Sequence, residues 1–148
     1  MSTPKTAKLV PQPDGTQPEE VMHISSFVLV RKGAHLLLVR RARPERMAGT
    51  WNLPSAVIYY GEDPGAAALR IVKEQLGATA TALKLLDVES FGDKHWDLCF
   101  VFEAEIPSVG RLGGDFDKDD YFDLSKLPPE LREGHREVLD MAKSRRVV

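Results

Sequence analysis

Apolar residues near the middle of the chain recur with the period of an α-helix over residues 64–76. Asp63 is a good N-cap, and Pro64 suits the first helical position, where its missing N–H costs nothing. Gly77 supplies the left-handed residue that commonly ends a helix. On a 3.6-residue repeat, one apolar stripe consists of Leu69, Val72 and Leu76. The pattern therefore predicts a capped helix that packs this stripe against a core.

Short apolar runs rich in β-forming residues predict strands on both sides of this helix. Residues 27–30 and 36–39 flank a turn signal at 31–34, which indicates a β-hairpin over 24–41. The continuous apolarity of both runs favours strands that are buried on both faces. Further runs predict strands at 57–60, 83–91 and 96–106, with a turn at 92–94.

The last part of the chain has the pattern of an amphipathic helix over residues 129–143. Its expected buried side consists of Leu131, Val138, Leu139 and Ala142. Strands that alternate with one mid-chain helix and one terminal helix favour an α/β sandwich. We expect residues 22–148 to form a single folded domain, and the Pro-rich residues 1–21 to form an extended arm.

Composition narrows the class of protein. At 148 residues, with 43% hydrophobic and 28% charged residues, the chain resembles an ordinary soluble domain. The formal net charge of −2 gives no indication of a nucleic-acid or membrane partner. The single cysteine, Cys99, excludes an internal disulfide and a thiol-rich metal site. No apolar run approaches the roughly 18 residues of a membrane helix, so we expect a cytoplasmic protein.

Four arginines lie at the end of the predicted hairpin and within a few residues after it: Arg40, Arg41, Arg43 and Arg46. One interpretation is a solvated loop. The other is that some of these guanidinium groups bind phosphate oxygens in bidentate fashion.

Four acids crowd the glycine-rich segment 113–120: Asp115, Asp117, Asp119 and Asp120. This segment reads either as a solvated acidic turn or as a source of a metal ligand or a base, because hard cations prefer carboxylate oxygens. EF-hand spacing is absent, which argues against calcium. Residues 121–128 then lead into the last predicted helix.

The stretch from residue 51 to residue 78 resembles the Nudix box, a long pattern of fixed offsets. The residues at matching offsets are Glu62, Arg70, Val72, Glu74, Gly77 and Ala78, and the usual lead-in is matched by Trp51, Leu53 and Pro54. Three positions depart from the pattern: Ala56 replaces a glycine, and Ile71 and Gln75 replace glutamates. The resemblance implies the Nudix fold, an α/β/α sandwich with a mixed β-sheet, the box helix and a C-terminal helix.

The resemblance also implies roles for individual residues. The implied metal ligands, for Mg²⁺ or Mn²⁺, are Glu74, Glu62 and Gln75. The implied catalytic residues are Glu74, Arg70, Asp117 and Asp120. The implied substrate-binding residues are Arg40, Arg41, Trp51, Pro54 and His95, around a pocket between the box helix, the 40–51 loop and the strand end near His95.

The departures from the pattern reduce the number of carboxylates that the box helix offers to a metal ion. Positions 71, 74 and 75 are three and four residues apart, so they share one face of the helix. That face carries Ile71, Glu74 and Gln75, and thus one negative charge where the family has three. If each lost contact between a charge and the metal costs a few kcal/mol, the rate falls by several powers of ten, at about 1.4 kcal/mol per decade.

We therefore expect a Nudix-fold protein that binds a nucleoside-diphosphate-linked small molecule, holds metal weakly, and hydrolyses slowly or not at all. An alternative is an active hydrolase with a rearranged metal site, built from Glu62, Glu74 and an acid of the 115–120 loop. A third reading is a non-catalytic protein-interaction module. A homodimer is left open by the sequence.

Overall fold

The structure is a computed structural model, and it describes residues 22–92 and 96–148. The predicted N-terminal arm, most of the 92–94 turn and His95 lie outside the described residues. Within the described part, no helix combines the length and the apolar character that crossing a lipid bilayer requires.

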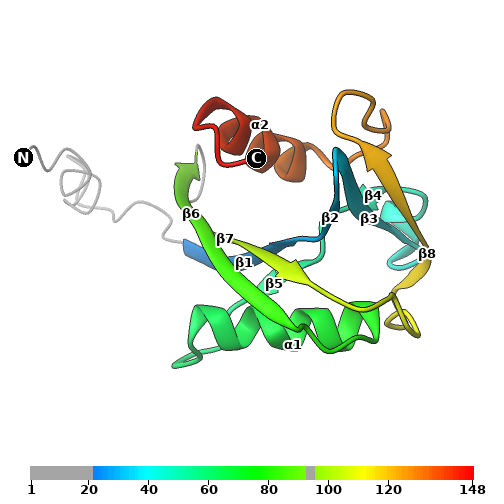
Figure 1. Ribbon diagram of the computed structural model, residues 1–148, viewed down its shortest axis with the longest axis horizontal. Helices are drawn as coiled ribbons and strands as arrows, with labels where there is room; N and C mark the ends of the chain where they lie inside the picture. The colour runs from blue at the N-terminus through cyan, green and yellow to red at the C-terminus, as the bar shows by residue number, and fades with distance from the viewer. Residues whose placement is uncertain (1–21, 93–95) are drawn as a thin grey trace, which may run out of the picture.

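Two β-sheets lie between two helices, as the sequence predicts for an α/β sandwich (Figure 1). The first sheet has the order β5 (Ser55–Val57), β1 (Met22–Leu29), β7 (Trp96–Glu105), β6 (Ala82–Gly92). Its central pair, β1 and β7, is parallel, and the other pairs are antiparallel. In the second sheet β3 (His35–Arg41) pairs with β2 (Arg31–Lys32), β4 (Trp51–Asn52) and β8 (Phe116–Asp123).

The helices α1 (Pro64–Leu76) and α2 (Glu133–Ser144) lie on opposite sides of the sheets (Figure 1). Each side has its own apolar core. Val28, Leu37 and Val39 pack toward α1, whereas Leu29, Leu36 and Leu38 pack toward α2. The alternation along β1 and β3 explains why both strands are apolar on both faces. A short 3₁₀ helix, η2 (Glu45–Met47), lies between β3 and β4.

The predicted ends of α1 are confirmed. The Asp63 side chain accepts a hydrogen bond from the Ala66 N–H at 3.1 Å, and Gly77 adopts the left-handed conformation with φ of 59°. The predicted apolar stripe is wrong at one position, because Leu69 is 47% exposed. The buried side of α1 is centred one residue earlier, and consists of Ala67, Ala68, Ile71, Val72 and Leu76. Leu69 lies about 100° around the helix from Ala68, on the edge of this buried side.

The predicted hairpin over residues 24–41 is also wrong. Residues 27–30 and 36–39 contribute to different sheets, and the true hairpin joins β2 to β3, with Arg31 opposite Leu36. Both runs are buried on both faces, so each needs its own neighbours on either side. The chain therefore crosses from one sheet to the other at Val30.

Three other predicted boundaries shift. The strand expected at 57–60 is β5, which ends at Val57, and Tyr59 and Tyr60 are exposed in the loop that follows. The segment 113–120, expected to be a loop, enters β8 at Phe116, because β3 offers a free edge for pairing. The helix expected from residue 129 begins at Glu133, after a segment that pairs with Trp51.

The C-terminal end of α1 packs against the backbone of the segment 110–113. Gly110 N–H donates to Leu76 O at 2.8 Å, and Gly113 N–H donates to Gln75 O at 3.0 Å. These bonds satisfy carbonyl groups that a helix end leaves unpaired. A Cβ atom on Gly77 would overlap the Arg111 backbone, and a Cβ on Gly110 would overlap Gly77 O. Residues 77 and 110 must therefore be glycine for the segment 110–113 to pack this closely against the end of α1.

Cys99 lies in the core beneath α2 and is only 3% exposed. Burial raises the pKa of its thiol to about 12, with Asp97 and Glu89 adding to the effect. The thiol therefore stays protonated, as a packing group.

Candidate active site

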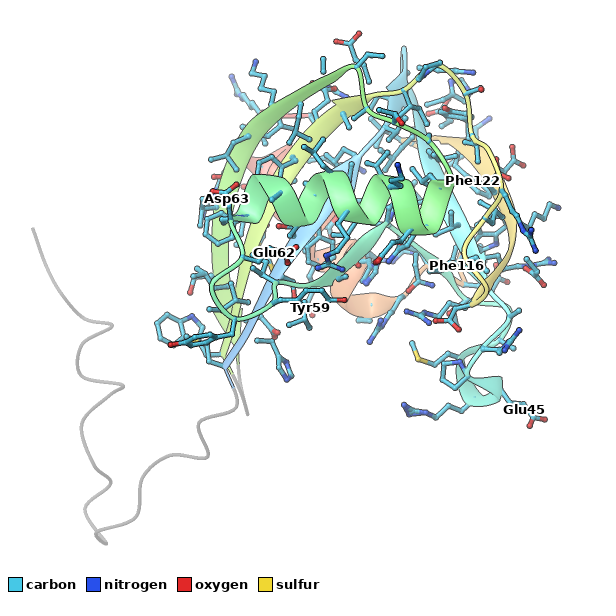
Figure 2. All side chains as sticks on the ribbon, turned by 90° about the horizontal axis from the view of Figure 1, so that it is seen from below. Glu45, Tyr59, Glu62, Asp63, Phe116 and Phe122 are labelled. Carbon is cyan, nitrogen blue, oxygen red and sulfur yellow. The ribbon has the colours of Figure 1, made fainter. Side chains whose placement is uncertain are left out.

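A cavity of about 290 Å³ opens between α1, β3 and the segment before β8. Figure 2 shows Tyr59 and Glu62 on the loop that runs along α1, and Phe116 beyond the other end of the helix. The residues that line the cavity are Arg41, Ala56, Tyr59, Arg70, Ile71, Glu74, Gln75, Gly113, Gly114, Asp115 and Phe116. The face of α1 that the sequence singles out, at positions 71, 74 and 75, therefore forms one wall of the cavity.

Arg70 organises the loop that precedes α1. Its Nε and Nη2 donate to the two carboxylate oxygens of Glu62 at 2.9 and 3.0 Å, and Nη2 also donates to Val57 O at 3.0 Å. The Tyr59 ring stacks on the guanidinium, 3.8 Å from its central carbon. Arg70 holds the pKa of Glu62 below its ordinary value, helped by the Tyr59 N–H that donates to the carboxylate at 3.0 Å. Glu62 is thus an ionised partner of Arg70.

Gln75 is held by the backbone of β5. Its Nε2 donates to Ser55 O at 2.8 Å, while its Oε1 accepts from Ser55 N–H at 3.3 Å. Both ends of the side-chain amide are therefore engaged, and the helix is fastened to the strand. The bond to Ser55 O needs the Nε2 donor of glutamine, which an ionised glutamate lacks.

Replacing Gln75 with glutamate is expected to lower the free energy of unfolding by roughly 1–3 kcal/mol at pH 7, because it removes a donor and sets a carboxylate against Ser55 O. Urea unfolding followed by circular dichroism measures the change. Below about pH 4 the introduced carboxyl is protonated and can donate again, so most of the loss should disappear. Equal stability of Gln75→Glu and the parent at pH 7 would contradict the role assigned to the amide.

Ile71 forms the apolar floor of the cavity and is 1% exposed. It packs in the same core as Val28, Leu37 and Val39. The side chain has no donor or acceptor, so it offers nothing to a cation. Its role in this chain is packing beneath the site.

Besides Glu62, which Arg70 engages, two residues with carboxylate side chains belong to or border the box and line the cavity: Glu74 and Asp115. The Glu74 side chain is 54% exposed, and its one printed ion pair within the described residues is a long contact with Arg70, at 3.4 Å. Asp115 follows Gly113 and Gly114, and its backbone oxygen accepts from the N–H groups at 42 and 43. In the sequence Asp115 is one of four neighbouring acids, and nothing in its residue type distinguishes it from the others. The two glycines before it are a signal of close backbone approach.

Two other acids proposed from the resemblance lie on β8 and do not line the cavity. Asp117 forms a bidentate pair with Arg40, at 3.0 and 3.3 Å, which lowers the pKa of its carboxyl and raises that of the guanidinium. Asp120 accepts from the Tyr121 N–H at 2.8 Å. The structure thus places Arg41 at the cavity and pairs its neighbour Arg40 elsewhere.

The remaining proposed substrate-binding residues are placed as follows. Trp51 is 8% exposed, packs edge-on against Phe122, and lies 5.9 Å from the Arg40 guanidinium. Pro54 is buried, and its carbonyl accepts from the Val28 N–H at 2.9 Å. Neither lines the cavity, and His95 lies outside the described residues.

Among the residues 22–92 and 96–148, no group of three or more His, Cys, Asp or Glu side chains is arranged to hold a metal ion. Glu62 is engaged by Arg70, and the Gln75 oxygen is engaged by Ser55. Mg²⁺ is often held by only one or two protein carboxylates together with substrate phosphates. Glu74 and Asp115 are therefore enough protein carboxylates for this kind of Mg²⁺ site.

A sequence model described as the NUDIX domain matches residues 21–142. "Putative 8-oxo-dGTP diphosphatase 2" of Mycobacterium tuberculosis is 36% identical over 107 residues, which cover 57% of this chain and 76% of that protein. "Nudix hydrolase 5" of Arabidopsis thaliana is 31% identical over 106 residues, which cover 65% of this chain and 34% of the relative. The matched region thus spans about a third of the Arabidopsis protein.

Solved structures share the fold. A MutT NUDIX hydrolase from Burkholderia pseudomallei aligns with a TM-score of 0.69 and 25% identity, over 82% of this chain and 98% of that chain. The NUDIX domain of Shewanella oneidensis NrtR, in a complex with ADP ribose, aligns with a TM-score of 0.62 and 16% identity, over 97% and 99%. The α/β sandwich described above is the architecture of these proteins.

Proposed function

The chain belongs to the NUDIX family, and we propose that it binds a nucleoside-diphosphate-linked small molecule in the cavity beside α1 and hydrolyses it slowly or not at all. The proposal rests on the side chains at positions 71, 74 and 75 of α1, the positions that carry glutamates in the Nudix box. Ile71 is buried and Gln75 is hydrogen-bonded to Ser55. Glu74 lines the cavity, and within the described part of the chain its carboxylate comes no closer than 3.4 Å to a cation.

Binding is supported by the chemistry of the cavity wall. Its volume of about 290 Å³ lies near the lower end of the range for small-molecule sites, about 300–1,000 Å³. The lining includes the Arg41 guanidinium, a cation suited to phosphate, and Tyr59, whose ring stacks on Arg70. The relatives named above include a diphosphatase of a nucleotide and a domain crystallised with ADP ribose, and the same class of ligand suits this wall.

Slow hydrolysis follows from the donor set. Glu74 and Asp115 would hold Mg²⁺ or Mn²⁺ together with the substrate phosphates, and such an ion supplies charge neutralisation and an activated water when bound. Glu62 keeps the Arg70 cation in place, and Arg70 in turn holds the 57–62 loop against the helix. With two carboxylates instead of a larger set, metal affinity and rate both fall.

Asp115 supports a second candidate, an active hydrolase with a rearranged site. The acid comes from the 115–120 segment and lines the same cavity as Glu74. In this reading Asp115 compensates for the acid missing at position 71 or 75. The two candidates share one site and differ in turnover.

The testing experiment compares the parent, Glu74→Gln and the control Glu137→Gln, which neutralises an exposed acid on α2. Phosphate products released from ADP-ribose and 8-oxo-dGTP are measured with Mg²⁺ or Mn²⁺, alongside ligand-induced stabilisation against urea. We expect low turnover in the parent and in Glu137→Gln, and a fall of roughly 100-fold in Glu74→Gln, since a lost charge contact of about 2–3 kcal/mol corresponds to about two decades.

Binding provides the second readout. Ligand near 100 times its dissociation constant should stabilise the parent by about 2.7 kcal/mol, and Glu74→Gln should retain most of this gain. Rapid parent turnover that is lost in Glu74→Gln would favour the rearranged hydrolase. Absence of any stabilisation by millimolar nucleotide would overturn the proposal and favour a protein-interaction module.

A further inference from the structure

The first sheet has an apolar face that α1 leaves uncovered at the start of β1. Cross-strand partners in β1, β7 and β6 form rungs whose side chains share one face of the sheet. Ser26 Oγ donates to Pro64 O at 2.9 Å, so the rung of Ser26 lies at the first residue of α1. From there α1 runs over Val28 and Val30, away from the two earlier rungs, and Figure 2 shows the start of β1 extending past the helix. We define the open face as the apolar residues of these three rungs: Met22, Ile24, Val88, Trp96, Leu98 and Phe100.

The open face is uncharged and only partly covered. Met22 is 46% exposed and Val88 is 40% exposed, and the other members are half-buried. Within the described residues, Phe100 is the one member that packs against either apolar core. The Trp96 Nε1 donates to Ser90 Oγ at 2.6 Å, which fixes the indole on this face, between β7 and β6. A continuous apolar surface of this kind marks a contact site.

The outer edge of β6 is blocked at its centre, so the open face is not covered by a strand that extends the sheet. Asp87 Oδ1 accepts from the Val88 N–H at 2.9 Å, and Arg145 Nη1 donates to Val88 O at 3.3 Å. The register also shifts between Leu85 and Asp87. Bulges and charged side chains are the usual protection of an edge strand against pairing with another molecule. The covering segment must therefore pack on the side chains of the open face.

Residues 1–21 join the folded domain at Met22, within the open face. They lie outside the described residues, and their sequence contains an apolar run at 9–13, with Leu9, Val10, Pro11 and Pro13. The Pro13-Asp14-Gly15 sequence is a turn signal, so the chain is predicted to reverse direction between this run and Met22. Residues 14–21 can span at most roughly 28 Å, whereas the open face is about 10 Å wide across its three strands. The apolar run is thus tethered within reach of the whole open face.

We propose that residues 9–13 fold back and pack on the open face, where they cover Met22, Trp96 and Val88. Proline-rich segments suit aromatic surfaces such as that of Trp96, because their conformation is already restricted before they bind. The short tether gives the run a high effective concentration at the face, so a weak contact is enough to keep it bound. This interaction is independent of the proposed nucleotide binding.

Acrylamide quenching of tryptophan fluorescence tests this packing in the full chain. The chain has two tryptophans, and Trp51 is only 8% exposed, so the response reports mainly on Trp96. The arm variant Leu9→Ser/Val10→Ser should raise the collisional quenching constant roughly twofold or more, because it removes most of the apolar contact area. The control Thr3→Ser/Thr6→Ser, in the same arm but outside the apolar run, should match the parent. In a Trp96→Phe background the difference between the arm variant and the parent should disappear.

A series of protein concentrations separates the arm from a second copy of the chain. Shielding of Trp96 by the arm should stay constant over about a hundredfold range of concentration, because the contact is intramolecular. Shielding that grows with concentration and survives in Leu9→Ser/Val10→Ser would overturn the proposal and assign the open face to a second copy. Equal quenching constants for the parent and the arm variant at every concentration would also overturn it. Urea unfolding of each variant verifies that the domain stays folded.

Discussion

Replacing Gly77 with alanine is expected to lower the free energy of unfolding by roughly 4 kcal/mol. Two effects combine at this position. The residue adopts φ of 59°, which a side chain disfavours, and an added Cβ would overlap the Arg111 backbone. Because the overlap is with backbone, no side chain can turn aside to relieve it. Chemical denaturation followed by tryptophan fluorescence measures the loss.

Gly33 provides a matched control for this prediction. It has the same φ of +59°, yet an added Cβ would meet nothing within 4 Å. Gly33→Ala should therefore cost only about 1 kcal/mol, from the backbone conformation alone. A Gly77→Ala variant no less stable than Gly33→Ala would show that the 110–113 segment can move away from α1 at little cost.

Replacing Glu89 with glutamine is expected to stabilise the protein by up to roughly 3 kcal/mol above pH 7. Glu89 is fully buried on β6, and burial raises the pKa of its carboxyl from 4.5 to about 7, with Asp87 adding to the rise and Arg145 opposing it. The unfolded chain therefore loses this proton before the folded chain does. The parent keeps the full contribution of the protonated carboxyl below about pH 4.5 and loses it as the pH rises through 7.

Urea unfolding at pH 5 and pH 8 tests this dependence. Glu89→Gln should resemble the parent at pH 5 and exceed it at pH 8, because the amide never ionises. Glu137→Gln, on the exposed side of α2, should follow the parent at both values. If the difference between Glu89→Gln and the parent is the same at pH 5 and pH 8, the buried carboxyl does not titrate in this window.

Features encoded by a few neighbouring residues were predictable from the sequence. The limits of α1 follow from Asp63, Pro64 and Gly77, whose effects act within one turn of the helix. The strands β6 and β7 follow from apolar runs within about two residues of their observed ends. The box offsets led to the α/β sandwich and to the family, because so long a pattern constrains both.

Features set by distant contacts were not predictable. Arg40 and Arg41 are neighbouring residues of the same type, so the sequence gives no reason to assign them different roles. The pairing between β3 and β8 places Arg40 against Asp117 and leaves Arg41 at the cavity. The selection of Asp115 depends likewise on how the segment before β8 packs against α1. The partner of Gln75 could not be inferred either, since β5 and α1 meet only in the folded chain.

Because Cys99 is buried, its reaction with a thiol reagent can report how often the folded protein unfolds locally or globally. The chain has one cysteine, in the core beneath α2, and a thiol with a pKa of about 12 is almost wholly unreactive while folded. A thiol-specific reagent should therefore modify Cys99 only in molecules that have opened, at a rate set by the population of open forms. Labelling of Gly77→Ala, Gln75→Glu and Glu89→Gln would then rank their stabilities in the native buffer, without denaturant and without a known substrate.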